Sequence, residues 1–113
     1  MMINPNSIEI VDNGLDFFSK EGNGKMWLTT KATLEVVSLA TKKGLAISKI
    51  EGFIWHKDVG RFEARLDAIF EGLVNPVKVP DDVNNNNTRA KESTEEDASL
   101  GHDAFVVTIA SRK

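Results

Sequence analysis

The sequence predicts an α+β fold, in which helices pack on one face of an antiparallel β-sheet. Residues 30–43 have the apolar spacing of an amphipathic helix, and Gly44 follows as a residue that can end it. Residues 61–70 alternate apolar and polar side chains, as a half-buried strand does. Residues 102–111 are apolar at almost consecutive positions, which is typical of a strand covered on both faces. Helix, strand, strand, weak helix and strand therefore follow one another along the chain, an order that favours an α+β protein.

The first of these helices carries its own start and stop signals. Thr29 stands at the N-cap, where its hydroxyl can accept a hydrogen bond from the exposed amides of the first turn. Lys42 and Lys43 fall in the last turn, where cations complement the negative end of the helix. Gly44 can adopt the positive φ of a C′ residue. Residues 45–50 then turn to apolar and β-branched side chains, which indicates that the chain folds straight back as a strand.

A β-hairpin is predicted next. Residues 58–60 supply turn-forming side chains between this strand and residues 61–70. Gly52, inside the first strand, indicates a bulge or a close approach of two backbones. Residues 61–70 also satisfy a helical period and contain good helix formers, but we favour the strand because the turn joins it to its predecessor. This second strand would place its apolar side chains on one face: Phe62, Ala64, Leu66, Ala68 and Phe70.

The last third of the chain is less regular. Residues 73–83 contain two of the three prolines and are expected to be irregular or to form an edge segment. Residues 84–87 are four asparagines, interpreted as a linker or an extended helix cap. Residues 88–100 are polar nearly all round, so a helix there would lie on the surface and touch the core weakly. Residues 102–111 are expected to form the central strand of the sheet.

A chain of 113 residues with 41% hydrophobic content suits one domain with a single modest core. We expect one domain over residues 1–113, divided into an N-terminal extension at 1–27 and a core at 28–111. Within the extension, residues 7–20 have apolar side chains at helical spacing, and a short helix is predicted there. Residues 21–25 are predicted to be a linker, because two glycines and an asparagine favour neither helix nor strand.

Composition excludes several classes of function. The formal net charge of -3 and the pI of about 5.4 argue against a nucleic-acid-binding protein, which needs a basic face. The absence of cysteine excludes disulfides, thiolate metal sites and thiol nucleophiles. No run approaches the roughly 18 apolar residues of a membrane span, and the N-terminus lacks the pattern of an export signal. A soluble cytoplasmic protein is therefore expected.

The two histidines are the only obvious candidates for acid–base chemistry. His56 has Asp58 two residues on, and His102 has Asp103 beside it. Adjacent strand residues point to opposite faces, however, so the second pair cannot meet within a strand. No nucleophile turn, phosphate loop or metal-ligand spacing accompanies either histidine. We therefore expect no catalytic residue, no cofactor and no metal, and interpret both histidines as structural.

Acidic side chains are concentrated in the second half of the chain. Between Asp58 and Asp103 there are eleven acidic residues and five basic ones. With Trp55, Phe62 and Phe70 nearby, such a surface could stand in for a nucleic acid, with carboxylates in place of phosphates and rings in place of bases. The alternative is a surface that serves only solubility. Trp55 itself is equally compatible with a core position and with a binding anchor.

Several segments carry a resemblance to a known family. Residues 28–45, LTTKATLEVVSLATKKGL, are followed by a strand in which Gly52 and Trp55 form a Gly-x-x-Trp ending. Further on, the asparagine run at 85–87, a polar acidic helix, a glycine and the strand at 104–108 come in the same order and spacing as in that family. In these features the chain resembles the immunity proteins of the colicin E-five type, bacterial inhibitors of toxins that cut tRNA at the anticodon. The likeness covers roughly residues 28 to 111 and is loose at 61–83.

The resemblance implies an antiparallel sheet with helices, no catalysis, and a protein that occupies the RNA-binding cleft of a toxin and imitates the anticodon. The expected partner is a cognate, basic ribonuclease toxin domain bound one to one, with no nucleic acid, no membrane and no cofactor. A toxin delivered by contact-dependent inhibition fits as well as a colicin. Arg61 and Arg65 would exclude non-cognate partners. The residues expected to face the toxin are Trp55, Asp58, Glu63, Asp67 and Glu71.

Two other functions remain as alternatives at this point. One is a small regulatory binding module unrelated to a toxin, for example an inhibitor of a housekeeping ribonuclease. The other is an enzyme that uses His56 or His102. An intact protective function after replacement of both histidines by alanine would exclude the enzyme.

Overall fold

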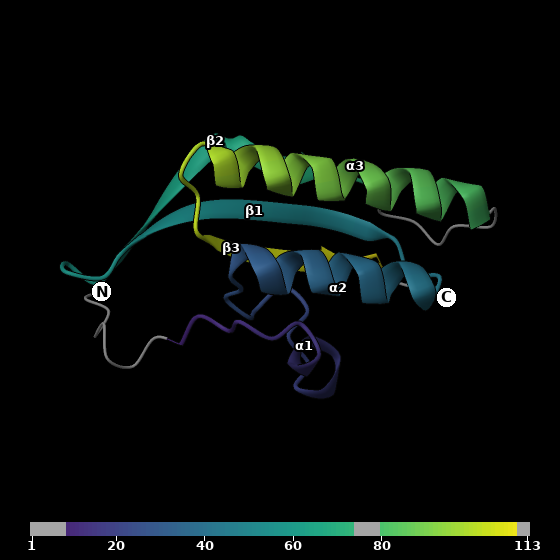
Figure 1. Cartoon of the computed structure of the whole chain (residues 1–113), viewed down its shortest axis with the longest axis horizontal. Coiled ribbons are helices and arrows are strands. Elements are labelled where there is room, and N and C mark those ends of the chain that lie inside the picture. The colour runs from purple at the N-terminus through teal and green to yellow at the C-terminus, as the bar shows by residue number, and fades with distance from the viewer. Residues whose placement is uncertain (1–8, 74–79, 111–113) are drawn as a thin grey trace.

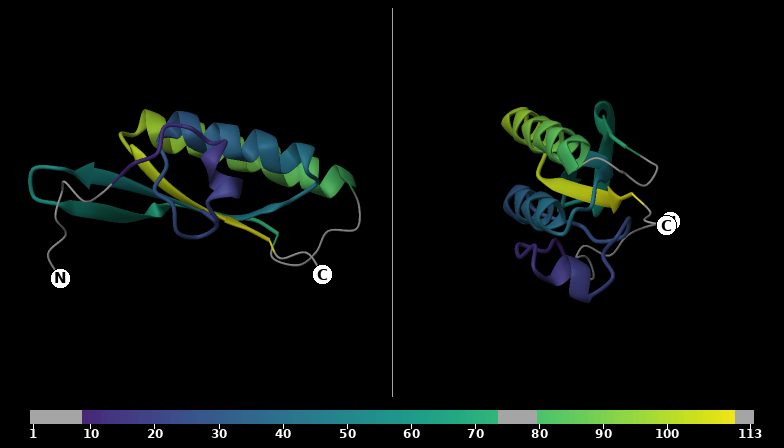
Figure 2. Two further views of the ribbon diagram at one scale, coloured as in Figure 1. Left: turned by 90° about the horizontal axis from the view of Figure 1, so that it is seen from below. Right: turned by 90° about the vertical axis from the view of Figure 1, so that its right-hand side faces the viewer.

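Two long helices cover one face of a three-stranded antiparallel sheet whose strand order is β2-β1-β3 (Figures 1 and 2). The computed structural model describes residues 9–73 and 80–110, without the side chains of residues 65–67, 80 and 81. The α+β class and the packing of helices on one face are confirmed. The elements are α1 (Asp16–Ser19), α2 (Thr30–Lys42), β1 (Ile47–His56), β2 (Arg61–Glu71), α3 (Pro80–Ser99) and β3 (Ala104–Ile109).

Helix α2 begins and ends where its sequence predicts. The Thr29 hydroxyl accepts a hydrogen bond from the Ala32 amide at 3.1 Å and donates one to Asp12 Oδ1 at 2.7 Å. After the last turn, Gly44 has a φ of 70°. Ala32, Val36 and other apolar side chains of the stripe are buried against the sheet. The predicted cap, helix and glycine stop are all confirmed.

Replacing Thr29 with alanine is expected to lower the free energy of unfolding by about 1 kcal/mol, because the Ala32 amide loses its acceptor. Urea unfolding measures the change. Thr30→Ala is a matched control, since the Thr30 side chain caps no amide of the helix. An equal loss in both variants would contradict the assigned cap.

A long bulge interrupts the β1–β2 hairpin. The two strands pair in two separate ladders. In the first, residues 49–51 of β1 pair with residues 71–69 of β2. In the second, residues 53–56 of β1 pair with residues 64–61 of β2. Between these ladders Gly52 alone faces four residues of β2. A Cβ on Gly52 would lie 3.1 Å from the Ala68 Cβ, so the backbones approach closely there. The predicted strand at 61–70 and the predicted bulge at Gly52 are confirmed.

The bulge reverses the faces of β2, because it adds three residues, an odd number, to one strand. Ala68 and Phe70 are buried beneath the helices. Phe62, by contrast, pairs with Trp55 on the opposite face, here called the outer face. The prediction of one apolar face along residues 61–70 was therefore wrong. Two local faces replace it, one on each side of the bulge.

The four asparagines lie inside helix α3, so their interpretation as a linker or cap was wrong. Asn86 and Asn87 are buried in the structure. The Asn87 amide group accepts from the Ile47 amide at 3.0 Å and donates to the Leu45 carbonyl at 2.9 Å. The Asn86 amide group donates to the Ile47 carbonyl at 2.8 Å. The two asparagine side chains therefore pair with main-chain groups of residues 45 and 47, at the start of β1. Buried main-chain groups need such partners wherever a neighbouring strand does not supply them.

Helix α3 also contacts the core more closely than its polar sequence predicts. Val83, Ala90 and Thr94 are all buried, and the Thr94 hydroxyl donates to the Ala90 carbonyl at 2.9 Å. Small side chains with internal partners thus allow a polar helix to lie against a sheet. The expectation of weak core contact was wrong. Of the proline-containing stretch 73–83, residues 74–79 lie outside the described residues, while the helix already covers residues 80–83.

The N-terminal segment is packed against the sheet. The Leu28 amide donates to the Phe105 carbonyl and the Phe105 amide to the Leu28 carbonyl, both at 2.8 Å, and the Gly24 amide donates to the Val107 carbonyl at 2.8 Å. Residues 23–28 therefore cover the free edge of β3, and β1 is the central strand. The prediction of β3 as the central strand was wrong. Helix α1 is a single turn inside the predicted 7–20 helix, and its Phe17 is buried in the core.

None of the helices in the described part of the chain has the length and apolarity that crossing a bilayer requires.

Candidate functional site

The β1–β2 hairpin projects beyond the ends of the two long helices (Figures 1 and 2). Residues 57–60 form the turn at its tip, where the Val59 amide donates to the His56 carbonyl at 3.3 Å and Gly60 has a φ of 63°. The Val59 side chain is 65% exposed. We call residues 53–64 the finger. It is the most prominent projection of the described structure.

Four aromatic rings meet on the outer face of the finger, and we call them the aromatic cluster. The Trp27 and Phe62 rings are stacked with centroids 3.6 Å apart and planes at 3°. Trp55 lies against Phe62 at 4.3 Å, and Phe53 meets Trp27 edge-on at 5.0 Å. All four side chains are partly exposed. Trp55 is therefore neither a core residue nor an isolated anchor but one ring of a partly exposed group.

Sequence reasoning missed Trp27. It lies before the segment that showed the resemblance, and no local period or motif marks it. Its neighbour Leu28 is buried and paired with Phe105, and adjacent residues of an extended segment point to opposite faces. The one available signal was a large aromatic ring directly before a residue predicted to enter the core.

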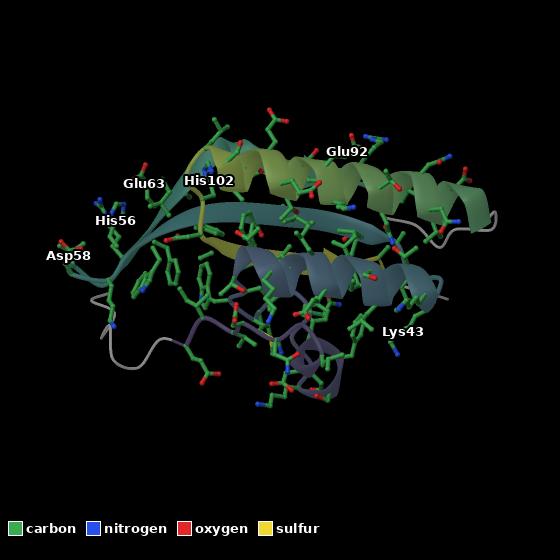
Figure 3. All side chains as sticks on the ribbon, viewed as in Figure 1. Lys43, His56, Asp58, Glu63, Glu92 and His102 are labelled. Carbon is green, nitrogen blue, oxygen red and sulfur yellow. The ribbon has the colours of Figure 1, made fainter. Side chains whose placement is uncertain are left out.

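Polar contacts brace the finger elsewhere. On the face opposite the aromatic cluster, His56 Nε2 lies 2.9 Å from Glu63 Oε1, and both side chains are about one-third exposed (Figure 3). At the side facing β3, Asp103 Oδ1 accepts from the Trp55 amide at 2.8 Å, and the Asp103 amide donates to the Phe53 carbonyl at 3.0 Å. The contacts hold the two strands to each other and to β3.

Neither of the histidine–aspartate couples considered from the sequence forms. His56 contacts Glu63 rather than Asp58. His102 is buried and its Nδ1 donates to the Asp97 carbonyl at 2.8 Å, while Asp103 is exposed and binds β1. Among residues 9–73 and 80–110, no three acidic, histidine or cysteine side chains are grouped so that they could hold a metal ion.

The five residues predicted to face a partner are only partly brought together. Trp55, Asp58 and Glu63 all belong to the finger, with Trp55 and Glu63 on opposite faces of it. Glu71 lies at the other end of β2, opposite Lys49. Asp67 lies in the bulge, and its side chain is outside the described part of the structure. The bulge and the length of β2 separate residues that a regular strand would have aligned.

The acidic side chains of the second half of the chain are not concentrated on the finger. The finger carries Lys57 and Arg61 as well as Asp58 and Glu63, so its formal charges cancel. The exposed carboxylates of Glu92, Glu95 and Glu96 instead form a ridge on the C-terminal half of α3 (Figure 3 labels Glu92). We call these three residues the acidic ridge. This end of the helix lies at the base of the finger (Figure 1).

Comparison with known proteins gives the same family as the resemblance. A family model described as Colicin-E5 Imm protein matches residues 26–110. The chain is 42% identical over 97 residues to the Immunity protein CdiI of Burkholderia pseudomallei, covering 86% of this chain and 85% of that protein. It is 31% identical over 84 residues to the Colicin-E5 immunity protein of Escherichia coli, covering 74% of this chain and 98% of that protein. The chain therefore belongs to the family of colicin-E5 immunity proteins.

Proposed function

We propose that this protein binds a cognate bacterial ribonuclease toxin one to one and neutralises it without catalysis. The observation that carries the proposal is the family match over residues 26–110, together with two relatives named as immunity proteins. One relative's name refers to colicin E5, which favours a toxin of that kind, and the other is an immunity protein called CdiI. The protein would act in the cytoplasm, where a toxin that cuts tRNA meets its substrate.

In this proposal the protein fills the RNA-binding cleft of the toxin with side chains that replace RNA. Carboxylates would take the positions of phosphates, and aromatic rings would take those of bases. Both kinds of side chain must then be accessible to the toxin in the same complex. The finger supplies rings on its outer face and the acidic ridge supplies carboxylates on the helix-covered side, so the cleft would have to contact both sides of the base of the finger. Arg61 and Arg65 would exclude toxins with a different cleft. The proposed contact residues remain Trp55, Asp58, Glu63, Asp67 and Glu71, joined by the acidic ridge.

Co-expression with the nuclease toxin domain encoded next to the gene for this chain tests the function. Cells that make the toxin domain should survive when this protein is present, and the purified pair should elute as a one-to-one complex. Binding is expected to be nanomolar or tighter and to weaken as salt is raised, because the charges involved are screened. A nuclease toxin of an unrelated family is the control. Failure to protect against the neighbouring toxin would contradict the proposal.

Changing Asp58, Glu63 and Asp67 together to their amides is expected to slow association with the toxin about 10-fold at low salt, since long-range attraction to a basic cleft falls. The free energy of unfolding should change by no more than about 1 kcal/mol, because Asp58 is exposed and solvent screens the partly exposed contact between Glu63 and His56. Stopped-flow binding at several salt concentrations measures the effect, which should shrink as salt is added.

The matched control makes the same charge change elsewhere on the molecule, at Asp16, Glu21 and Asp82, which lie outside the β1–β2 hairpin. Its effect on association is expected to be smaller, because local charge near the cleft dominates the encounter. Equal slowing by both triple variants would mean that only net charge matters and would remove Asp58, Glu63 and Asp67 from the interface.

A further inference from the structure

A two-stranded ribbon that leaves its sheet is only marginally stable in water. The finger is such a ribbon, since it projects beyond the helices that cover the rest of β1 and β2 (Figure 1). It is nevertheless held by contacts on both of its faces and along one side, through residues that are not all its own. These braces fix the shape and direction of a segment that contributes little to the core.

The main brace on the outer face comes from Trp27. The paired main-chain hydrogen bonds of Leu28 and Phe105, both 2.8 Å, fix the backbone next to Trp27 on the edge of β3. The Trp27 ring in turn lies flat on Phe62, 3.6 Å away, and touches Phe53 edge-on. A side chain from the N-terminal segment, next to a backbone anchored on β3, thus packs directly against the finger.

A second brace acts at the side of the finger. Asp103 is the residue just before β3, where its carboxylate accepts from the Trp55 amide at 2.8 Å and its amide donates to the Phe53 carbonyl at 3.0 Å. The ladder between β1 and β3 is thus continued onto the finger. His56 and Glu63 contact each other across the remaining face.

The tip of the finger presents an apolar side chain. Val59 is 65% exposed, and it stands in the turn between Asp58 and Gly60. The charges around it cancel, so the tip is not suited to a purely basic surface. A rigid projection with an apolar end and charged flanks fits a concave cleft that has an apolar floor and a polar rim.

We propose that the finger is a pre-formed insert that enters the cleft of the toxin with Val59 at its tip, and that Trp27 is the positioning residue that holds its direction. This inference rests on the proposed function for the identity of the partner. It assigns close contact to the finger, and long-range attraction to the acidic ridge together with the carboxylates of the hairpin. Affinity then depends on the fraction of molecules whose finger is already in the bound orientation.

The tip is tested with Val59→Ser and Val59→Ile, using the nuclease toxin domain encoded next to the gene for this chain. Val59→Ser should weaken binding about 10-fold, mainly through faster dissociation, because it removes one buried apolar side chain from the complex. Val59→Ile should bind within about 2-fold of the wild type, since it keeps the apolar contact. Leu15→Ser is the matched control, as Leu15 is 62% exposed and lies outside the finger.

The brace is tested with Trp27→Ala and Trp27→Phe. If the finger of Trp27→Ala keeps its bound orientation in one molecule out of about ten, the association rate and the affinity fall about 10-fold. Amide hydrogen exchange at residues 53–64 should accelerate in the same variant, and Trp27→Phe should largely restore both measurements because a ring again covers Phe62. Phe18→Ala, which removes a ring of the N-terminal segment outside the aromatic cluster, should change neither.

Normal toxin binding by both Val59→Ser and Trp27→Ala would overturn the inserted finger while leaving the proposed function intact. Absence of binding by the wild type would overturn the proposed function and the insertion together, whereas the exchange data would still decide whether Trp27 braces the finger. Self-association of the wild type that Val59→Ser abolishes would make a second copy the occupant and would also overturn the proposal. Sedimentation velocity measures that association.

Discussion

Replacing Asn87 with leucine is expected to lower the free energy of unfolding by about 4 kcal/mol, because several buried polar groups lose their partner at once. The Asn87 side chain is 1% exposed. It accepts from the Ile47 amide at 3.0 Å and donates to the Leu45 carbonyl and the Thr41 hydroxyl, each at 2.9 Å. A domain of this size has roughly 5–15 kcal/mol of stability, so the loss would be a large share of it. Urea unfolding followed by circular dichroism measures the change.

Asn85→Leu is the matched control, since it makes the same substitution in the same run at an exposed position of α3. It should change the free energy of unfolding by less than about 1 kcal/mol. If Asn87→Leu were as stable as Asn85→Leu, the amide contacts at the start of β1 would contribute nothing, and the buried network would not explain why α3 lies where it does.

If Trp55 faces the toxin as proposed, replacing it with alanine is expected to weaken toxin binding about 30-fold or more. Truncation of a partly exposed aromatic ring at the centre of an interface commonly removes this much affinity. The ring also supports Phe62 at 4.3 Å, so the variant loses part of the brace on the finger together with the contact. Surface plasmon resonance with the toxin domain measures affinity, and survival under toxin expression gives the cellular result.

Trp55→Phe separates the two contributions, because a phenyl ring can still lie against Phe62 but offers a smaller contact to a partner. Affinity between those of the wild type and Trp55→Ala is expected. The main-chain bond from the Trp55 amide to Asp103 at 2.8 Å should survive in both variants, so their thermal unfolding should differ little. Full toxin binding by Trp55→Ala would place the interface away from the aromatic cluster.

The proposed roles of the acidic ridge in attracting the toxin and of the finger in contacting it have a kinetic consequence. The finger has no net formal charge, whereas the acidic ridge on α3 has three exposed carboxylates. Changing Glu92, Glu95 and Glu96 together to glutamine is expected to slow association without much effect on dissociation, since rim charges act mainly on the encounter. Stopped-flow association and dissociation rates measured at low and high salt check this, and an unchanged association rate at low salt would remove the ridge from the interface.

The elements that could be predicted from the amino-acid sequence alone are those whose signals act over a few residues. Thr29 marks the start of helix α2 and Gly44 its end. Both could be read from the sequence, because capping and positive φ depend only on neighbouring residues. Alternation predicted β2, and Gly52 predicted the bulge, since a residue without a Cβ is what a close backbone approach requires. The family could be inferred too, because its resemblance lies in the helix and the last strand, which these local rules shape.

Which side chains share a surface depends on contacts between remote segments, and these appear only in the folded protein. The bulge opposite Gly52 adds an odd number of residues, and that parity moves Phe62 to the outer face while Phe70 stays in the core. Asn87 and Trp27 find their partners 40 and 35 positions away along the chain, at Ile47 and Phe62. A pattern of neighbouring residues cannot reveal partners so far apart in the sequence. Hydrogen bonds and ring stacking between remote segments form only once the strands and helices have been brought together.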